Sequence, residues 1–411
     1  MSRISVRAAT ILLFLLVVMT GSVQAQTLSV APSGEDYSGL QQALDAALPG
    51  DVIEIAAGTY PGGVIVNIPI TLAGKDSATI GTGADTVALY VNADDVVIQN
   101  LVCIASGAGI IANQTKGFRV DGCRIISDDS GIILTGCRES AVANTEITAL
   151  RTGIETVFCN TTTISRSRVS GDSVGISIKD SSDTAVETTR LLGSEIGIIM
   201  ENSNRCGLKD TMFAGVGGAV LGIGISEFTI TGSTFTDVTQ YIQFYAASEC
   251  RVEAPSLQGP TFFAADIFSD TEYRCDPYSI FGRDFGLLYD PYEAPEGYLL
   301  FGDAMNITFI AAAESTELPV VIITADLLEN TTGIAENTYG IYRTDAGEPA
   351  LIAVPKVSSE GGQILQTTVT EPGNFALMAR AEEEESPYYY IFLWVIVALG
   401  VLLLLVLWRK Q

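Results

Sequence analysis

Apolar residues recur along this chain with a period of 22 residues. A Gly-Ile pair appears five times at that spacing, and apolar residues follow one, eleven and sixteen positions after the glycine position. Seven successive units with three positions each give 21 sites, and all are apolar although only 47% of the sequence is hydrophobic. Such self-similarity is the mark of a stacked repeat protein. The paired glycines are Gly109, Gly131, Gly153, Gly175 and Gly197.

Each unit has the pattern of short β-strands. Apolar and polar residues alternate in brief runs such as 120–125, and β-branched residues are plentiful. Paired helices would need a longer unit and a 3.6-residue period, and a leucine-rich horseshoe would need regularly spaced leucines. We therefore predict an all-β chain that coils, its strands pairing in parallel from coil to coil at about 4.8 Å. Eight coils from Val87 to about Leu257 would form a rod of about 40 Å.

Two further features of the unit suggest how a coil closes. The five repeated glycines are predicted to be corner residues, because glycine adopts positive φ without steric cost. Small residues recur at a second position, and we expect them to stack inside the coils as a ladder. This ladder would comprise Thr115, Cys137, Cys159, Ser181 and Ser203.

The regular repeat spans residues 87–260, and other patterns flank it. Residues 26–86 are predicted to form an N-terminal cap and the first coils, since Leu40, Ala43 and Leu44 share one helical face. After residue 260 the period stops, and 261–297 is interpreted as a C-terminal cap or linker. Residues 298–381 are predicted to form a small antiparallel β-sandwich, because turn signals separate short strand-like runs. These runs are 306–310, 320–324, 339–343, 350–354, 364–370 and 374–378.

Both ends of the chain have the pattern of export and membrane anchoring. Residues 1–25 are predicted to be a signal peptide, with an uncleaved anchor as the alternative. Residues 388–408 are predicted to be a transmembrane helix, preceded by an acidic spacer at 382–387 and followed by a basic tail at 409–411. A buried core helix and a cleaved signal for a lipid anchor are the alternatives. The expected localisation is the cell membrane, with a single span, an extracellular N-terminal ectodomain and a short cytoplasmic C-terminus.

The charge balance restricts the partners. The chain has 48 acidic and 22 basic residues, a formal net charge of −26, and no histidine. Nucleic-acid binding is not expected, because it requires clustered Lys and Arg that displace counterions from phosphates. The absence of histidine removes the commonest general acid/base and the commonest transition-metal ligand.

Several of these motifs resemble known proteins. The predicted helix, the "PGD" turn, the "AGTY" segment and the "ITLAG" strand resemble the N-terminal cap of right-handed parallel β-helix proteins of the pectate-lyase-like class. The repeat is similar to that of the copper-binding periplasmic NosD family, which prefers Ser at Cys137 and Asn at Thr145. The resemblance covers about 27–260 and implies a right-handed β-helix without implying one activity. Residues 370–379 resemble the close of membrane-proximal modules in archaeal surface proteins, and the acidity fits an archaeal source.

The resemblance raises the question of an enzyme site. Enzymes of this class act on acidic polysaccharides with carboxylates, calcium and a basic residue. The repeat separates the candidate carboxylates here, since Asp128 maps onto Leu150 and only then onto Asp172, and turns commonly contain Asp. Calcium at one corner stays open, since adjacent carboxylates are suitable ligands, while copper would need sets of Cys, His or Met that this sequence lacks. The other candidates are Asp94, Asp95, Asp129, Asp180 and Asp183, with Arg124, Arg151, Arg166 and Arg168 nearby.

The seven cysteines and four sequons are the remaining candidates. Cys137 and Cys159 occupy equivalent positions in adjacent coils, so either a disulfide or a buried thiol ladder is open. Cys250 and Cys275 are candidates for a disulfide that would join the C-terminal cap to the last coil. Export would make the Asn-x-Ser/Thr sequons glycosylation candidates. They are Asn113, Asn160, Asn306 and Asn330.

Two functions from different classes follow. The first is a non-enzymatic, membrane-anchored surface protein that serves envelope structure, adhesion or glycan binding, with glycans or envelope proteins as partners and no cofactor. The second is a surface-tethered polysaccharide lyase or glycoside hydrolase. The enzyme would require three or more carboxylates and a Lys or Arg that converge on one face.

Overall fold

The computed structural model describes residues 25–33, 36–253, 261–265, 269, 271–275, 278–290, 292–301, 304–309, 321–325, 327, 334–335, 337–345, 347–357 and 363–381. The chain forms two compact units, Met1–Gln258 with Phe263–Thr271, and Gly259–Phe262 with Glu272–Gln411. The predicted signal peptide (apart from Ala25), acidic spacer, transmembrane segment and basic tail lie outside the described residues. Within these ranges, no helix has the length and apolarity needed to span a bilayer.

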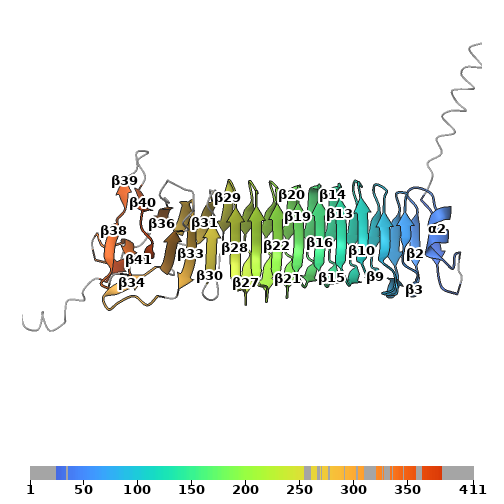
Figure 1. Cartoon of the computed structure of the whole chain (residues 1–411), viewed down its shortest axis with the longest axis horizontal. Helices are drawn as coiled ribbons and strands as arrows, with labels where there is room; N and C mark the ends of the chain where they lie inside the picture. The colour runs from blue at the N-terminus through green and yellow to red at the C-terminus, as the bar shows by residue number, and fades with distance from the viewer. Residues whose placement is uncertain are drawn as a thin grey trace, which may run out of the picture. The chain divides into compact units, whose positions relative to one another are not determined.

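The first unit is a right-handed parallel β-solenoid, which confirms the predicted fold. Three sheets, A, B and C, run along it, and neighbouring strands of each sheet come from successive coils (Figure 1). Sheet A contains β1 (Thr27–Val30), β2 (Val52–Ile55), β5 (Thr71–Gly74), β8 (Val97–Gln99), β11 (Arg119–Asp121), β14 (Arg138–Ala143), β17 (Asn160–Ser165), β20 (Ser182–Glu187), β23 (Gly207–Lys209), β26 (Thr229–Thr231) and β29 (Cys250–Glu253).

Sheets B and C complete each coil. Sheet B contains β3 (Gly58–Tyr60), β6 (Ala78–Ile80), β9 (Val102–Ala105), β12 (Arg124–Ser127), β15 (Glu146–Ala149), β18 (Arg168–Gly171), β21 (Arg190–Leu192), β24 (Met212–Ala214) and β27 (Thr234–Thr236). Sheet C contains β4 (Val64–Val66), β7 (Val87–Val91), β10 (Ala108–Asn113), β13 (Ser130–Thr135), β16 (Thr152–Val157), β19 (Val174–Lys179), β22 (Ile196–Glu201), β25 (Gly218–Ile223), β28 (Gln240–Tyr245) and β30 (Thr261–Ala265).

The 22-residue period is the register of these sheets. Val120 pairs with Val142 in sheet A, Ile125 with Ile147 in sheet B, and Ile132 with Ile154 in sheet C. All six side chains are buried. The three apolar positions of the repeat therefore supply one core residue to each sheet, and burial of these branched side chains stabilises the solenoid.

The bends of the coil lie at other positions than the repeated glycines. Residues with positive φ form columns between the sheets, as at Asn144 (49°), Asp180 (47°) and Gly215 (62°). Asn, Asp and Gly adopt this left-handed conformation most readily. One column continues through Asn100, Gly122, Asn144, Arg166, Thr188, Asp210 and Gly232.

The prediction that the five Gly-Ile glycines are corner residues was wrong. Gly131 is the second residue of β13 and has no positive φ. A Cβ added there would lie 2.3 Å from Cγ2 of Ile147 and 2.5 Å from the carbonyl oxygen of Gly153. Glycine is needed because the core residue of sheet B fills the space that a side chain would occupy.

Small polar side chains stack inside the coils, as predicted for the ladder that begins at Thr115. Its five members are buried. The Thr115 hydroxyl donates to Sγ of Cys137 at 3.3 Å, and the backbone N–H of Cys159 donates to Oγ of Ser181 at 3.0 Å. A side chain of one coil thus satisfies a backbone N–H of the preceding coil, which would otherwise be unpaired in the core.

A short helix covers the first coils, as predicted. Helix α2 (Leu40–Ala46) buries Leu40, Ala43 and Leu44 and contacts β1, β2 and β4. Asp51 follows the Pro-Gly turn and is buried; its carboxylate accepts hydrogen bonds from the backbone N–H groups of Gln26 and Leu48, both at 2.8 Å. The carboxylate therefore ties the start of the solenoid to the turn after α2.

Asp51→Asn should destabilise the N-terminal cap and reduce its sensitivity to acid. The two N–H donors, first Gln26 and then Leu48, lower the pKa of Asp51 from its usual 3.8. Because the folded pKa is depressed, the charged carboxylate stabilises the fold above about pH 4, and that stability is lost as pH falls through the folded pKa. Urea unfolding between about pH 2 and 6 should show a smaller acid-dependent loss in the variant. Asp45→Asn, an exposed change on α2, is the matched control; equal profiles for the two variants would contradict the expectation.

The second unit contains two antiparallel sheets. One contains β32 (Tyr278–Gly282), β36 (Val321–Ala325), β40 (Gln363–Val369) and β39 (Lys356–Val357). The other contains β33 (Phe285–Asp290), β35 (Ala304–Phe309), β41 (Gly373–Arg380), β37 (Gly340–Arg343), β38 (Ala350–Ala353) and β34 (Tyr298–Leu300). The buried N–H of Leu377 donates to the Tyr278 hydroxyl at 2.6 Å and links the two sheets.

The six strands expected between residues 306 and 378 are present within a few residues of their predicted bounds. Part of the predicted cap or linker at 261–297 is instead strand. β32 and β33 pair with β36 and β35, so they belong to the antiparallel sheets. Tyr278, Ile280, Phe285 and Leu287 are buried. Their two-residue alternation is interrupted by a turn and flanked by Asp and Pro, which obscured it in the sequence.

Candidate functional site: an arginine-lined groove

The candidate carboxylates of the solenoid do not converge. Asp129 pairs with Arg151, Asp183 pairs with Arg205 at 2.9 Å, and Asp180 accepts a hydrogen bond from the Asn202 side chain at 3.2 Å. Asp94 accepts from the backbone N–H of Lys116 at 2.7 Å. Each acid stabilises its own turn or column, as expected for turn residues.

These local pairs also determine the electrostatics. The Arg205 guanidinium holds the pKa of Asp183 below its usual value, and the Asp129 carboxylate raises the pKa of Arg151. Both shifts favour the charged forms, so these groups stay ionised near neutral pH. A general acid or base needs a pKa near the working pH, and these shifts move the pKa values of Asp183 and Arg151 away from neutrality.

Three arginines of the solenoid come together in a groove between sheets A and B. We call it the arginine groove; it is lined by Arg166, Arg168, Thr188, Arg190, Asp210 and Met212, among others. Its volume is about 360 Å³. Arg166 and Arg168 were candidates from the sequence, whereas Arg190 was missed. The 22-residue period could have identified it, because Arg190 follows Arg168 by one period and is its register partner.

Local structure explains why the arginines face outward. Arg166 is a corner residue with φ of 48°, and Arg168 begins β18 two residues later. Between them Ser167 is buried, and its Oγ accepts a hydrogen bond from the backbone N–H of Thr145 at 3.2 Å. Arg190 lies beside Arg168 at the start of β21. All three arginines are exposed.

The arginine groove has little carboxylate to neutralise it. Among its lining residues, Asp210 is the single acid. Glu146 is the register partner of Arg168 on the preceding coil. Its carboxylate forms an ion pair with Arg124, at 3.6 Å. Arg166 donates from Nε to Oδ1 of Asn144 at 3.0 Å. Among the described ion pairs, none involves Arg166, Arg168 or Arg190.

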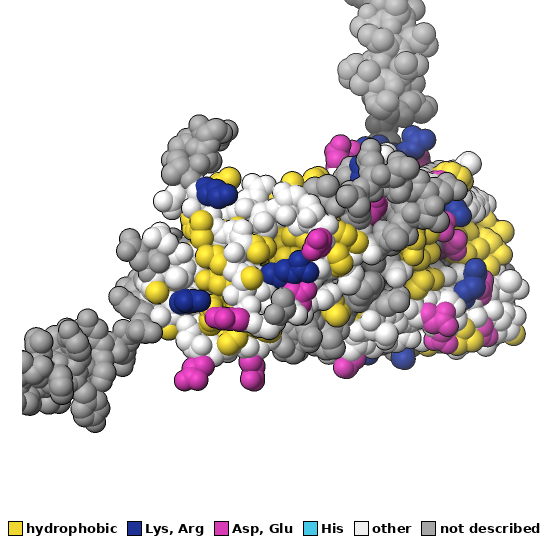
Figure 2. All heavy atoms as spheres, turned by 60° about the vertical axis from the view of Figure 1, so that its left-hand side comes forward, with side chains coloured by type: hydrophobic (Ala, Val, Ile, Leu, Met, Phe, Trp, Pro, Cys, Tyr) yellow, Lys and Arg dark blue, Asp and Glu magenta, His cyan; other side chains and the backbone are white. Residues whose placement is uncertain are grey.

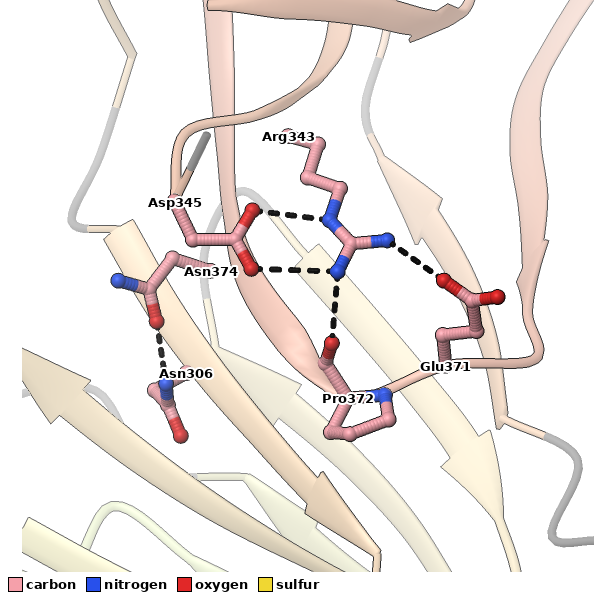
Figure 3. Close-up of polar contacts among 6 residues, drawn as sticks. All are labelled: Asn306, Arg343, Asp345, Glu371, Pro372 and Asn374. Carbon is pink, nitrogen blue, oxygen red and sulfur yellow. Dashed lines mark hydrogen bonds and ion pairs between the residues drawn. The ribbon is translucent and has the colours of Figure 1, made fainter. Parts of the chain in front are cut away.

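An arginine of the second unit shows the opposite arrangement. Arg343 donates to both carboxylate oxygens of Asp345 at 2.8 and 3.2 Å, to Glu371 at 3.2 Å and to the carbonyl oxygen of Pro372 at 3.0 Å (Figure 3). Four hydrogen bonds to the protein hold this guanidinium, which connects the end of β37 to the start of β41. The arginines of the groove, by contrast, retain donors for a ligand. On the face shown in Figure 2, acidic and basic side chains lie among hydrophobic ones.

The described cysteines are buried free thiols: Cys103, Cys123, Cys137, Cys159, Cys206 and Cys250. For Cys137 and Cys159, the thiol-ladder alternative therefore describes the structure. The candidate Cys250–Cys275 disulfide is not formed, because Sγ of Cys250 is buried and donates to the carbonyl oxygen of Ser248 at 3.5 Å. Burial raises the pKa of the thiols of Cys123 and Cys250 to about 11.

Alkylation of the cysteines tests this arrangement. The reactive species is the thiolate, so these buried thiols should resist iodoacetamide near neutral pH in the folded protein. After unfolding without reductant, all seven cysteines should be labelled. If only five cysteines are labelled, the remaining two of the seven are bonded to each other, and the protein contains a disulfide. Mass spectrometry of the labelled peptides distinguishes the outcomes.

Three of the four sequons lie in the described residues and differ in accessibility. Asn113 ends β10 and Asn160 begins β17, and both are exposed. Asn306 is half-buried within β35, and its side-chain amide donates to Oδ1 of Asn374 (Figure 3). Asn330 lies outside the described ranges.

Glycan occupancy should follow these environments. Expressed in a host that N-glycosylates exported proteins, the chain should carry glycans at Asn113 and Asn160 and none at Asn306, whose amide nitrogen is held between strands. Peptide mapping by mass spectrometry before and after enzymatic deglycosylation measures occupancy. A glycan on Asn306 with Asn113 and Asn160 empty would contradict the assignment.

The fold and groove define a parallel β-solenoid repeat protein with a basic lateral groove. Residues 87–252 match the family model of the periplasmic copper-binding protein NosD. No curated protein matches the sequence.

Among solved structures, the chain is similar to an alginate lyase from Paenibacillus sp. str. FPU-7, at 18% identity over 61% of this chain and 96% of that chain, with a TM-score of 0.39. It is also similar to tailspike protein 2 of Escherichia coli O157:H7 bacteriophage CAB120, at 10% identity over 87% and 72% of the two chains, with a TM-score of 0.43.

The described residues of this chain do not fit a copper site. Copper requires gathered thiolate, thioether or imidazole ligands. In the part of the chain that the structure describes, no group of three or more His, Cys, Asp or Glu side chains is placed to hold a metal ion. The thiols of Cys137 and Cys159 instead donate to the carbonyl oxygens of Ala112 and Leu134, at 3.3 and 3.4 Å.

Proposed function

We propose that this protein is a non-enzymatic, membrane-anchored surface protein whose solenoid binds glycans outside the cell. The observation that carries the proposal is the arginine groove, in which three exposed arginines are accompanied by Thr188 and Thr234, with Asp210 as the single acid among the lining residues. Glycan recognition needs hydrogen-bond donors and acceptors on a pre-formed surface. Hydrolysis would in addition need two carboxylates that flank the scissile bond.

The predicted ends of the chain agree with this function. A signal peptide at 1–25 would export the chain, and a helix at 388–408 would retain it at the membrane with the solenoid outside. Protease treatment of intact cells should then remove the solenoid and leave a short membrane-bound fragment. Complete protection of the chain in intact cells would contradict the proposed orientation.

The direct test uses the full-length protein in detergent. It should be retained by members of a panel of immobilised neutral and acidic polysaccharides, and the soluble polysaccharides should not be shortened during incubation with or without calcium. Size-exclusion chromatography and a reducing-end assay measure shortening. Cleavage of any polysaccharide would overturn the non-enzymatic assignment in favour of a lyase or hydrolase, and retention by none would contradict glycan binding.

A further inference from the structure

We propose that the arginine groove selects glycans that carry anionic groups, carboxylate or sulfate, with one group held per coil. This inference rests on the proposed glycan binding and names the class of glycan. The overall charge of −26 would by itself repel such a ligand. A local cluster of cations is therefore required for binding, and the groove supplies one.

The arrangement of the three guanidinium groups suits a polyanion. Arg166 and Arg168 lie in one coil on either side of the inward-facing Ser167, and Arg190 lies in the next coil. Guanidinium groups bind carboxylate and sulfate oxygens through paired N–H donors. One coil can thus bind an anionic group between Arg166 and Arg168. Arg190, on the next coil, can bind the next anionic group along the glycan.

The spacing along the solenoid sets the orientation of the ligand. Arg168 and Arg190 are direct register partners on parallel strands, which lie about 4.8 Å apart. A glycan lying parallel to the solenoid axis would present successive anionic sugars to successive coils.

Energetics also favours an anionic ligand. Like charges directly opposite on neighbouring strands destabilise a sheet. Elsewhere in sheet B the same column pairs Arg124 with Glu146 at 3.6 Å, so opposite charges can occupy adjacent positions. At Arg168 and Arg190 two cations adjoin instead, and a bound anion would relieve their repulsion.

Binding of the full-length protein to a glycan array tests the inference. The array carries uronate-containing, sulfated and neutral glycans, so that binding to carboxylate groups can be distinguished from binding to sulfate groups. The wild type should bind one or both acidic classes, more weakly as salt rises. Arg168→Ala/Arg190→Ala should weaken that binding about tenfold or more. Arg168→Lys/Arg190→Lys, which keeps the charge and loses the paired donors, should weaken it less.

The matched control is Arg119→Ala/Arg138→Ala. These arginines are exposed on β11 and β14, outside the groove, and the change in net charge is the same. Melting temperatures no lower than that of the wild type show that each pair of variants is folded; for Arg168→Ala/Arg190→Ala the loss of repulsion should raise the melting temperature. Equal losses in both alanine pairs would overturn the groove as the site, leaving general charge as the cause. If the wild type binds neutral glycans alone, and Arg168→Ala/Arg190→Ala binds them equally well, the inference is overturned and the proposed function remains. If the wild type binds no glycan, the inference and the proposed function are both contradicted.

Discussion

Gly153→Ala is expected to lower the free energy of unfolding by about 1–3 kcal/mol, although it adds a single methyl group. A Cβ at Gly153 would lie 2.3 Å from Cγ1 of Val169 and 2.6 Å from the carbonyl oxygen of Gly175. Normal carbon contacts are about 3.5–4.0 Å, so the strand of sheet C must shift away from its neighbours. Urea unfolding followed by circular dichroism measures the change.

Two further variants separate packing from backbone conformation. Gly215→Asn is the matched control: Gly215 has φ of 62° with open space around it, and Asp237 holds the equivalent position one coil later at 51°. This variant should stay within about 0.5 kcal/mol of the wild type. Adding Val169→Ala to Gly153→Ala should recover only part of the loss, because the contact with the Gly175 backbone remains. Greater destabilisation by Gly215→Asn than by Gly153→Ala would restore the corner interpretation.

Phe213→Ala should have the larger effect, a loss of about 3–5 kcal/mol. The Phe213 ring is fully buried and stacks on Phe235, with ring centroids 5.1 Å apart and planes 12° apart. It also fills the space beside Gly197, where a Cβ would lie 2.7 Å from the ring. Truncation removes the stack and leaves a cavity between sheets B and C.

The neighbouring residue provides the control for this prediction. Met212 lies on the same strand, β24, but faces outward with 37% of its surface exposed. Met212→Ala should change the free energy of unfolding by less than about 0.5 kcal/mol. Thermal and urea unfolding of both variants measure the difference. Similar losses for Met212→Ala and Phe213→Ala would show that the inward and outward assignments of β24 are wrong.

The solenoid could be predicted from the sequence because one physical constraint repeats in every coil. The three apolar positions after each glycine position supply the cores of sheets C, A and B, and a period of 22 residues is directly visible in them. The reason for the glycines was not visible. A glycine that turns and a glycine that makes room look alike in a sequence, and only the position of Ile147 beside Gly131 distinguishes them.

The arginine groove was predictable in part. Arg166 and Arg168 stood out as a pair of cations near candidate acids, but their meaning depends on which acids lie beside them. Glu146 lies in register between Arg124 and Arg168 and forms its ion pair with Arg124, while Arg190 follows Arg168. The choice of ion-pair partner depends on side-chain conformation, which the sequence does not show. Likewise β32 and β33 were hidden because their partners, β36 and β35, lie far along the chain or behind intervening turns.

The constant register of sheets A, B and C gives the solenoid a simple route to change its length. A duplication or deletion of 22 residues would add or remove one whole coil and leave every buried column continuous. Each such event would change the length by about 4.8 Å and introduce one new set of outward residues. If the proposed binding of one anionic sugar per coil is correct, the number of sugars that one molecule engages would change in whole-number steps, by recombination between coils.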